Sequence, residues 1–345
     1  MCETPGPIGK KQARIFEKCR IAIITDGGFS MGMGHVYRTI SLANRLSLHA
    51  IVQFITQSDE VVVNKIKGNN FSIRKVDDLK EMKDFLCEYR PDVVVIDKLY
   101  VDEEFAEFIK VNLFAKLVIF GNVSAANHHA DLVINAVIGT DYKNTSYVDK
   151  KRGTLYLEGP RYLVLRREFY SMKNTYKFRN KLEKILLLFG GSDPANLTSK
   201  VLAKLLEMNP SFKITVVLGS AFQFDDVVHN LLKRKKAADV VVHIDVNNVY
   251  NYMVNSDLVL TSPGTTMFES FCIGTPTVAF YQNPSQREIF HGFGPLYEFD
   301  KIVDFKNFLY RFYSKYVIQK VEIDKLEVGE GKENIINAIL SKGDK

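Results

Sequence analysis

A histidine and an arginine follow a glycine-rich stretch near the start of the chain, in the segment Gly32-Met33-Gly34-His35-Val36-Tyr37-Arg38. An apolar run at 21–24 precedes this segment and an amphipathic pattern follows it, which predicts a strand, a loop and then a helix. Such a loop presents backbone N–H groups and the positive end of a helix to an anion, and Gly34 lets that anion approach the backbone closely. His35 in the first helical turn is placed for acid–base chemistry beside a phosphate, and Arg38 one turn later is placed to contact that phosphate.

The helix start also disfavours the charged imidazolium, so we expect a neutral His35 that acts as a base. The segment is not a Walker A loop, because it lacks Gly-Lys-Ser/Thr. It is not a full dinucleotide fingerprint either, because Tyr37 occupies the third glycine position. Taken alone, a histidine at a helix start is also explained as a polar cap.

A second glycine loop, Gly190-Gly191-Ser192-Asp193-Pro194, follows the apolar run at 185–189. The amide of Gly191 and the hydroxyl of Ser192 suit a phosphate at a helix start. A plain turn, with Asp193 as the helix cap and the proline as the first helical residue, explains the same residues.

A third loop, Ser262-Pro263-Gly264-Thr265-Thr266-Met267-Phe268-Glu269, again follows an apolar run. Gly264, Thr265 and Thr266 suit a diphosphate at a helix start. The carboxylate of Glu269, one turn inside the helix, suits the two hydroxyls of a ribose. A threonine at a helix start with a nearby glutamate is also a capping pattern.

A fourth loop, Tyr281-Gln282-Asn283-Pro284-Ser285-Gln286-Arg287, follows the apolar run at 277–280. Asn283, Ser285 and Gln286 suit the hydroxyl and acetamido groups of a sugar, because an amide offers both a donor and an acceptor. A polar surface loop accounts for the same residues.

Short β-branched runs alternate with longer helical patterns along the chain. Strands are predicted at 21–24, 51–55, 93–96, 117–120, 132–134, 185–189, 213–218, 240–244, 258–260, 277–280 and 321–323. Helices are predicted at 36–48, 60–67, 79–89, 102–112, 197–206, 224–234, 249–254, 265–272 and 331–341. This alternation is typical of parallel sheets covered by helices on both faces.

The order of the elements predicts two Rossmann-type α/β domains. We expect a flexible extension at 1–20, an N-terminal domain at 21–165 that carries the His35 loop, a linker at 166–183 and a C-terminal domain at 184–345. Ligands of open α/β sheets bind outside the carboxyl ends of the strands, so all four loops are expected to face a cleft between the two sheets.

Composition narrows the function classes. The net charge is +6 over 345 residues and no basic run is dense enough to indicate a nucleic-acid partner. No apolar run approaches the ~20 residues of a membrane span, and the N-terminus lacks the apolar segment of a signal peptide. The four cysteines show no spacing typical of a metal or redox pair, which favours a reducing cytoplasm.

Together these motifs resemble a known family. The chain is similar to the nucleotide-sugar hydrolase of pseudaminic acid biosynthesis and to its relatives, the spore-coat polysaccharide proteins, within the MurG-related group that has the two-domain GT-B fold. The resemblance covers about 21–340. The matching stretches are Gly32–Arg38, Asn127–Asn135, Gly159–Phe169, Gly190–Thr198 and Gly264–Glu269.

The resemblance implies a UDP-sugar site whose nucleotide lies on the C-terminal domain. Uracil would be read by backbone near Ile244, the ribose by Glu269, and the diphosphate by the loops at Gly191 and Gly264–Thr266. His35 matches the family's catalytic histidine, which activates a water that attacks the anomeric carbon and releases UDP and a free amino sugar. That family requires no metal and no other cofactor.

Three departures from the family pattern fall on the sugar side of the expected site. Ser285-Gln286 stands where the family usually has Asn-Gln, with Asn283 close enough to substitute. The tyrosine expected soon after Asp97 comes one place late, as Tyr100, and Gly121-Asn122 replaces a common acidic pair. The identity of the sugar therefore stays open.

Three functions are consistent with these residues. The first is a hydrolase that cleaves UDP from a UDP-diacetamido-trideoxyhexose in pseudaminic-type acid biosynthesis. The second is a glycosyltransferase that uses a UDP-sugar such as UDP-N-acetylglucosamine, with His35 deprotonating an acceptor hydroxyl, in surface polysaccharide synthesis. The third is a nucleotide-sugar-binding protein without catalysis. The first two need the same donor site and the same base, so the sequence does not separate them, and it leaves the oligomeric state open.

Overall fold

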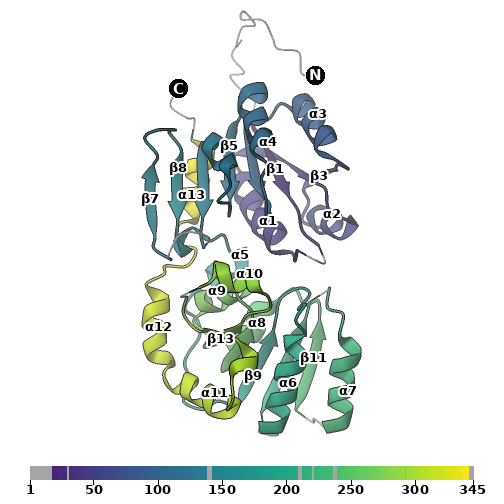
Figure 1. Cartoon of the computed structure of the whole chain (residues 1–345), viewed down its shortest axis with the longest axis vertical. Coiled ribbons are helices and arrows are strands. Elements are labelled where there is room, and N and C mark those ends of the chain that lie inside the picture. The colour runs from purple at the N-terminus through teal and green to yellow at the C-terminus, as the bar shows by residue number, and fades with distance from the viewer. Residues whose placement is uncertain are drawn as a thin grey trace, which may run out of the picture. The chain divides into compact units, whose positions relative to one another are not determined.

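The computed structural model describes residues 18–28, 31–137, 142–208, 212–219, 221–235, 239–291 and 293–341. The described residues form two compact units (Figure 1). The first unit comprises the residues up to 28, those of 35–164 and those from 330 onward, and the second comprises those of 165–329 and the short segment before residue 35. Most of the extension expected at 1–20 lies outside the described residues.

The first unit contains an eight-stranded sheet in the order β3-β2-β1-β4-β5-β6-β8-β7. Its strands pair in parallel, except that β7 runs antiparallel to β8. The central strands are buried aliphatic runs, as parallel strands covered on both faces require. The bounds are β1 Cys19–Thr25, β2 Ala50–Thr56, β3 Ser72–Lys75, β4 Val93–Asp97, β5 Lys116–Phe120, β6 Leu132–Asn135, β7 Thr145–Val148 and β8 Leu155–Glu158.

Helices α1 to α4 of the first unit each follow the carboxyl end of a strand, and α13 comes after helix α12 (Tyr316–Asp324) in the chain. The α-helices are α1 Gly34–Leu46, α2 Glu60–Lys67, α3 Leu79–Tyr89, α4 Glu103–Phe108 and α13 Lys332–Leu340, and short π and 3-10 turns span Ile109–Leu113, Ala125–His129 and Pro160–Tyr162. Helix α1 buries Val36, Ala43 and Leu46, which fixes its rotation on the sheet. Asp78 and Asp102 cap α3 and α4 by accepting hydrogen bonds from backbone N–H groups of the first turn.

Helix α13 belongs to the first unit, whereas the sequence suggested that the whole segment 184–345 forms the C-terminal domain. The N–H of Gly331 donates to the carbonyl of Arg161 at 2.8 Å, and Lys116 donates to the carbonyls of Ala338 and Ser341 at the end of the helix. A side chain at position 331 would lie 2.6 Å from the ring of Tyr162, so a glycine allows this close approach. These contacts join segments that are far apart in the sequence (Figure 1), so the local pattern of apolar residues cannot predict them.

The second unit contains a six-stranded parallel sheet in the order β11-β10-β9-β12-β13-β14. Its strands are β9 Lys184–Leu188, β10 Lys213–Leu218, β11 Val240–Ile244, β12 Leu258–Thr261, β13 Thr277–Phe280 and β14 Leu296–Tyr297. Its helices are α5 Arg167–Ser171, α6 Leu197–Met208, α7 Asp225–Lys235, α8 Val249–Asn255, α9 Thr265–Ile273, α10 Pro284–Ile289, α11 Phe305–Ser314 and α12 Tyr316–Asp324, with a 3-10 turn at Phe299–Lys301. Among the described residues, no helix is long and apolar enough to cross a membrane.

Several elements differ from the sequence prediction. The segment 321–323, which the sequence predicted to be a strand, lies inside helix α12. A run of three residues with two apolar side chains is too short to distinguish a strand from a helix by its pattern. The expected linker at 166–183 contains helix α5. The strands β3, β7, β8 and β14 were not predicted, because their alternating or very short patterns give little apolar signal.

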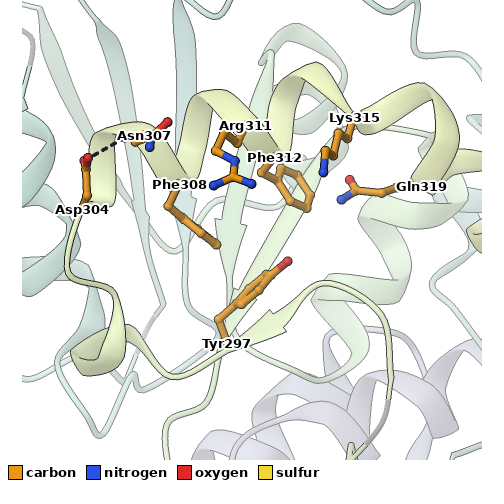
Figure 2. A pocket seen from close by; sticks show the side chains of 8 residues that line it. All are labelled: Tyr297, Asp304, Asn307, Phe308, Arg311, Phe312, Lys315 and Gln319. Atoms are coloured by element: carbon orange, nitrogen blue, oxygen red, sulfur yellow. Dashed lines mark hydrogen bonds between the residues drawn. The ribbon is translucent and has the colours of Figure 1, made fainter.

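Helix α11 covers the short edge strand β14 through aromatic contacts. The ring of Tyr297, at the end of β14, lies 4.7 Å from the ring of Phe308 in a T-shaped arrangement. Asp304 caps the helix by accepting a hydrogen bond from the N–H of Asn307 at 3.0 Å (Figure 2). These contacts line one wall of a surface pocket beside β14, into which Arg311 and Lys315 also project.

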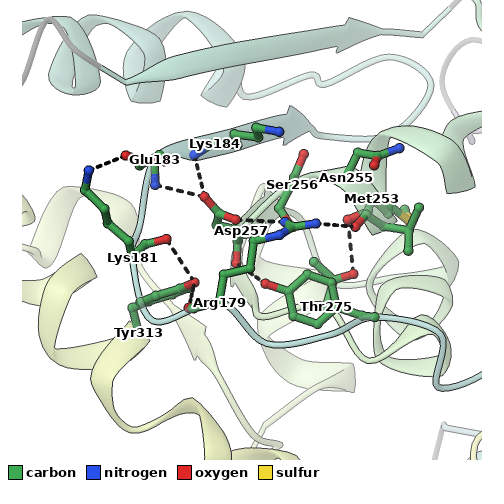
Figure 3. A network of polar contacts seen from close by, with 12 residues as sticks. Arg179, Lys181, Glu183, Lys184, Met253, Asn255, Ser256, Asp257, Thr275 and Tyr313 are labelled. Atoms are coloured by element: carbon green, nitrogen blue, oxygen red, sulfur yellow. Dashed lines mark hydrogen bonds and ion pairs between the residues drawn. The ribbon is translucent and has the colours of Figure 1, made fainter.

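A buried aspartate joins the entry of the second unit to its sheet. Asp257, just before β12, accepts hydrogen bonds from the N–H groups of Glu183 and Lys184 at 2.9 and 2.7 Å and from Arg179 Nη1 at 2.8 Å (Figure 3). Tyr313 of α11 adds a hydrogen bond to the carbonyl of Arg179. This network holds the chain where it enters β9.

We expect Asp257→Ala to lower the free energy of unfolding of the second unit by about 2–4 kcal/mol, because two part-buried N–H groups and a guanidinium lose the buried carboxylate that accepts their hydrogen bonds. Urea titration followed by circular dichroism measures this loss. Arg179→Ala is the matched control and should cost about 1 kcal/mol or less, because the side chain of Arg179 is 41% exposed. Equal losses for the two variants would contradict the assignment of Asp257 as the acceptor that holds this segment.

Candidate functional site

Each sheet has a point near its middle at which the order of the parallel strands reverses. In the first unit β2 and β4 lie on opposite sides of β1, and in the second unit β10 and β12 lie on opposite sides of β9. Ligands of open α/β sheets bind at the carboxyl ends of the strands that flank such a point. The His35 loop follows β1, and the loops of Gly191 and Gly264 follow β9 and β12, so three of the four predicted loops begin at these positions.

Asp97, the last residue of β4, binds both His35 and Arg38. Nδ1 of His35 lies 2.6 Å from Oδ1 of Asp97, and Arg38 donates from Nε to Oδ2 at 2.6 Å and from Nη2 to Oδ1 at 2.5 Å. The side chain of Asp97 is fully buried, whereas those of His35 and Arg38 are 17% and 20% exposed. These three residues, the Asp97 cluster, are therefore anchored inside the unit and reach solvent through the histidine and the arginine.

The charge of Asp97 determines the hydrogen position on His35. Burial by itself raises the pKa of Asp97, but Arg38 and His35 lower that pKa from 3.8 to about 2. The carboxylate is ionised at neutral pH, so it can only accept hydrogen bonds, from Arg38 and from His35 alike. Nδ1 of His35 must therefore carry the hydrogen shared with Asp97, which leaves Nε2 of the neutral ring free to take a proton.

The residue after Asp97 holds the other end of the same loop. Nζ of Lys98 lies 2.6 Å from Oδ2 of Asp26, which directly follows β1. Asp26 also accepts hydrogen bonds from Thr56 and from the N–H of Gln57. Burial raises the pKa of Asp26, but Lys98 and these hydrogen bonds lower it further than burial raises it. Two consecutive residues at the end of β4 thus fix the start of the His35 loop and the helix that follows it.

In the second unit, the loop after β9 uses its acid as a cap. Asp193 accepts hydrogen bonds from the N–H groups of Leu197 and Thr198 at 2.9 and 2.7 Å, so the start of α6 is already satisfied. The predicted capping role of Asp193 is confirmed, but Pro194 precedes the helix rather than opening it. Any phosphate at this loop would have to use the amides of Gly191 and Ser192 instead of the helix start.

The N-terminus of α9 has no such cap. Gly264 stands before the helix with φ 154° and no side-chain cap, and a Cβ placed there would meet nothing within 4 Å. That backbone conformation favours glycine, and it leaves the first N–H groups of α9 open. Thr265 and Thr266 are partly exposed in the first turn. An uncapped helix start of this kind is suited to an anion, and the predicted diphosphate contact of Gly264, Thr265 and Thr266 stays a prediction.

The amide side chains of the fourth loop bind protein backbone. Asn283 caps α10 by accepting a hydrogen bond from the N–H of Gln286 at 2.8 Å. Gln286 donates to the carbonyl of Pro263 at 3.0 Å and accepts from the N–H of Gln282, whose own amide donates to the carbonyl of Phe189 at 2.8 Å. These hydrogen bonds join three loops at one edge of the sheet. The predicted sugar contacts of Asn283 and Gln286 stay predictions, and any such contact shares these side chains with the protein backbone.

Glu269 is also occupied. Both of its carboxylate oxygens accept hydrogen bonds from Arg166, from Nε at 2.7 Å and from Nη2 at 2.8 Å. The side chain of Glu269 is 2% exposed. The predicted ribose contact of Glu269 stays a prediction, and any such contact shares the carboxylate with Arg166.

The other predicted contacts are exposed. Ile244 at the end of β11 is 62% exposed and Tyr100 after β4 is 68% exposed, and Ser285 in α10 is exposed as well. Their predicted roles stay predictions. Ile244 lies at the carboxyl end of its strand, on the same edge of the sheet as the loops that follow β9 and β12.

The sequence suggests that Asp97, an acid that ends a buried apolar strand, faces the cleft, but it does not give the partners of Asp97. Two residues, Arg166 and Gln282, were missing from the predicted site. Arginine and glutamine are common in polar segments, and only the folded chain brings these two to Glu269 and Phe189.

Comparison with known proteins gives two relatives by sequence. No protein-family model matches the chain. An uncharacterized protein from Methanocaldococcus jannaschii is 43% identical over 329 residues, which are 93% of this chain and 66% of that protein, so the chain spans just under two thirds of that relative. The spore coat polysaccharide biosynthesis protein SpsG from Bacillus subtilis is 28% identical over 277 residues, which are 76% of this chain and 77% of that protein.

Solved structures are similar over nearly the whole chain. MurG from Acinetobacter baumannii aligns with a TM-score of 0.60 and 13% identity over 93% of this chain and 99% of its own. HepE from Anabaena, in complex with UDP-glucose, aligns with a TM-score of 0.53 and 13% identity over 93% of this chain and 95% of its own. The fold is thus two parallel-sheet α/β units of the GT-B type found in glycosyltransferases, which confirms the predicted fold class.

The lowered pKa of Asp97 gives a prediction for stability. Because the folded-state pKa of about 2 lies below the ordinary 3.8, the stability that ionised Asp97 contributes is complete above about pH 5 and is lost as the pH falls toward 2. We expect the excess free energy of unfolding of wild type over Asp97→Asn to shrink by about 2 kcal/mol between about pH 5 and about pH 2. Urea titrations of both proteins at these pH values measure the difference, and a constant difference would contradict the Arg38–Asp97 pairing.

Proposed function

We propose that this chain is a nucleotide-sugar hydrolase that cleaves UDP from a UDP-diacetamido-trideoxyhexose, with His35 as the general base. The observation that carries the proposal is the Asp97 cluster, in which a buried, ionised carboxylate fixes the ring of His35 and leaves Nε2 as its free base. A histidine oriented by a carboxylate in this way is suited to remove a proton from a weak oxygen nucleophile.

In the proposed reaction, Nε2 of His35 takes a proton from water while the water oxygen attacks the anomeric carbon. The bond between that carbon and the diphosphate oxygen breaks, and UDP leaves with the bonding electrons. The products are UDP and the free amino sugar, and His35 returns its proton to solvent. A single direct displacement inverts the configuration at the anomeric carbon.

The second unit supplies the proposed nucleotide site. The open N-terminus of α9 and the amides of Gly191 and Ser192 would hold the diphosphate, because helix starts and glycine loops stabilise negative charge. The backbone near Ile244 would contact uracil, and Glu269 would contact the ribose. A solved structure of the same fold, HepE, is in complex with UDP-glucose, which supports the choice of UDP.

A glycosyltransferase is the second candidate. The same base would deprotonate an acceptor hydroxyl instead of water, and the same site would hold the UDP-sugar. The resemblance to SpsG, whose name places it in spore coat polysaccharide biosynthesis, favours this candidate.

The cytoplasmic location, the absence of a cofactor and the amino sugar as partner stay predictions.

We expect His35→Asn to lower kcat by about 10²–10⁴, as the loss of a general base does, while the Kd for UDP changes little. Stopped assays of UDP release give kcat, and isothermal titration gives Kd. His49→Asn is the matched control, because His49 is an exposed histidine outside the Asp97 cluster. A His35→Asn protein with wild-type turnover would refute the role of His35.

A labelling experiment distinguishes water from a hydroxyl acceptor. In H₂¹⁸O, the purified protein is incubated with UDP-diacetamido-trideoxyhexose or with UDP-N-acetylglucosamine, and the products are examined by mass spectrometry. A hydrolase should place ¹⁸O in the released sugar and none in UDP, without any added acceptor. Release of UDP only after an acceptor glycan is added would favour the transferase.

A further inference from the structure

The carboxylate proposed to contact the ribose is held by an arginine that directly precedes another helix. Glu269 of α9 accepts two parallel hydrogen bonds from the guanidinium of Arg166, at 2.7 and 2.8 Å. Arg166 directly precedes α5, and its guanidinium lies over the ring of Phe169 at 4.9 Å. A planar guanidinium bound at two points and packed on an aromatic ring has little rotational freedom, so the carboxylate that it holds is fixed in orientation.

The segment that carries Arg166 is attached along α9. The N–H of Asn174 donates to the carbonyl of Cys272 at 2.9 Å, and the N–H of Tyr176 donates to the carbonyl of Ile273 at 3.2 Å. Phe169 is fully buried. The arginine is thus part of a scaffold on the same helix whose N-terminus is the proposed diphosphate site.

Arg166 also maintains the charge of Glu269. Burial raises the pKa of Glu269, Arg166 opposes that rise, and the nearby carboxylate of Glu168 adds to it. Without Arg166, the buried carboxylate would have Glu168 as its charged neighbour and would lose its own charge more readily. A neutral carboxylic acid is a weaker acceptor for hydroxyl groups than a carboxylate is.

The pairing does not exhaust the acceptor capacity of Glu269. A carboxylate has about four acceptor positions on its two oxygens, and Arg166 uses two of them. We take the two remaining positions to be those that accept the two hydroxyls of a ribose.

We infer that Arg166 is a positioning residue for nucleotide recognition: it fixes the Glu269 carboxylate so that its remaining acceptor positions select a ribose with both hydroxyls. The inference rests on the proposed function, because it takes the ligand to be a uridine nucleotide. It assigns discrimination between ribose and deoxyribose to a residue that does not itself contact the sugar.

The test compares binding of UDP with binding of 2′-deoxyuridine 5′-diphosphate by isothermal titration at pH 7.5. Wild type should bind UDP about 10-fold or more tightly than it binds the deoxy analogue, as expected for the loss of a hydrogen bond to a charged group. Arg166→Met and Glu269→Gln should each bring this ratio close to 1. Arg167→Met is the matched control, because Arg167 is the exposed neighbouring arginine, and it should leave the ratio unchanged.

The double variant Arg166→Met/Glu269→Gln separates positioning from direct contact. If Arg166 acts through Glu269, the double variant should bind UDP no more weakly than Glu269→Gln alone. Additive losses would mean that Arg166 contacts the phosphates itself and would overturn the inference. Arg166→Lys keeps the charge without the paired geometry and should give an intermediate ratio, so it replaces Arg166→Met if that variant does not fold.

The outcomes also separate this inference from the proposed function. A wild-type protein that binds no UDP would overturn both. A wild-type protein that binds UDP without preferring the ribose, or an Arg166→Met protein that keeps the preference, would overturn the inference and leave the proposed UDP site standing.

Discussion

The burial of the Asp97 carboxylate is the constraint on which the candidate site depends. A fully buried carboxylate is costly unless a cation and hydrogen bonds compensate it, and Arg38 supplies both with two short hydrogen bonds. Oδ1 of Asp97 also accepts a hydrogen bond from Nδ1 of His35, and this bond gives the ring one orientation and one tautomer. The same physical requirement that stabilises the first unit therefore also fixes the orientation of the His35 ring.

The second unit meets the same requirement in another place. Glu269 is as deeply buried as Asp97, and Arg166 compensates it with two hydrogen bonds. Burial raises the pKa of both carboxylates and their cationic partners lower it, but the net direction differs. The pKa of Asp97 falls below its ordinary value, whereas the pKa of Glu269 stays raised. Asp97 has a second partner in His35, while Glu269 has the like charge of Glu168 nearby, and this difference in neighbours accounts for the opposite directions.

Several polar side chains in the loops of the second unit form hydrogen bonds with the protein backbone. Asp193 and Asn283 satisfy helix starts, and Gln286 joins its own loop to the carbonyl of Pro263. Amide and carboxylate side chains suit a sugar and a backbone equally well, because both present N–H, O–H and C=O groups. The start of α9 differs, because Gly264 stands where a capping side chain would and the backbone N–H groups of the first turn have no side-chain cap.

The sequence by itself determined the parallel α/β architecture and the place of the loops, because continuous apolar strands and glycine-rich turns are local patterns. It also predicted site roles for His35, Arg38 and Gly264, whose signals lie within a few residues of a helix start. Only the tertiary structure decided that Asp97 joins His35 to Arg38 and that Arg166 holds Glu269, because these pairs are 59 to 103 residues apart in the chain. Long-range pairing of buried charges depends on which strands and helices become neighbours, and that information is in the sheet order rather than in any local pattern.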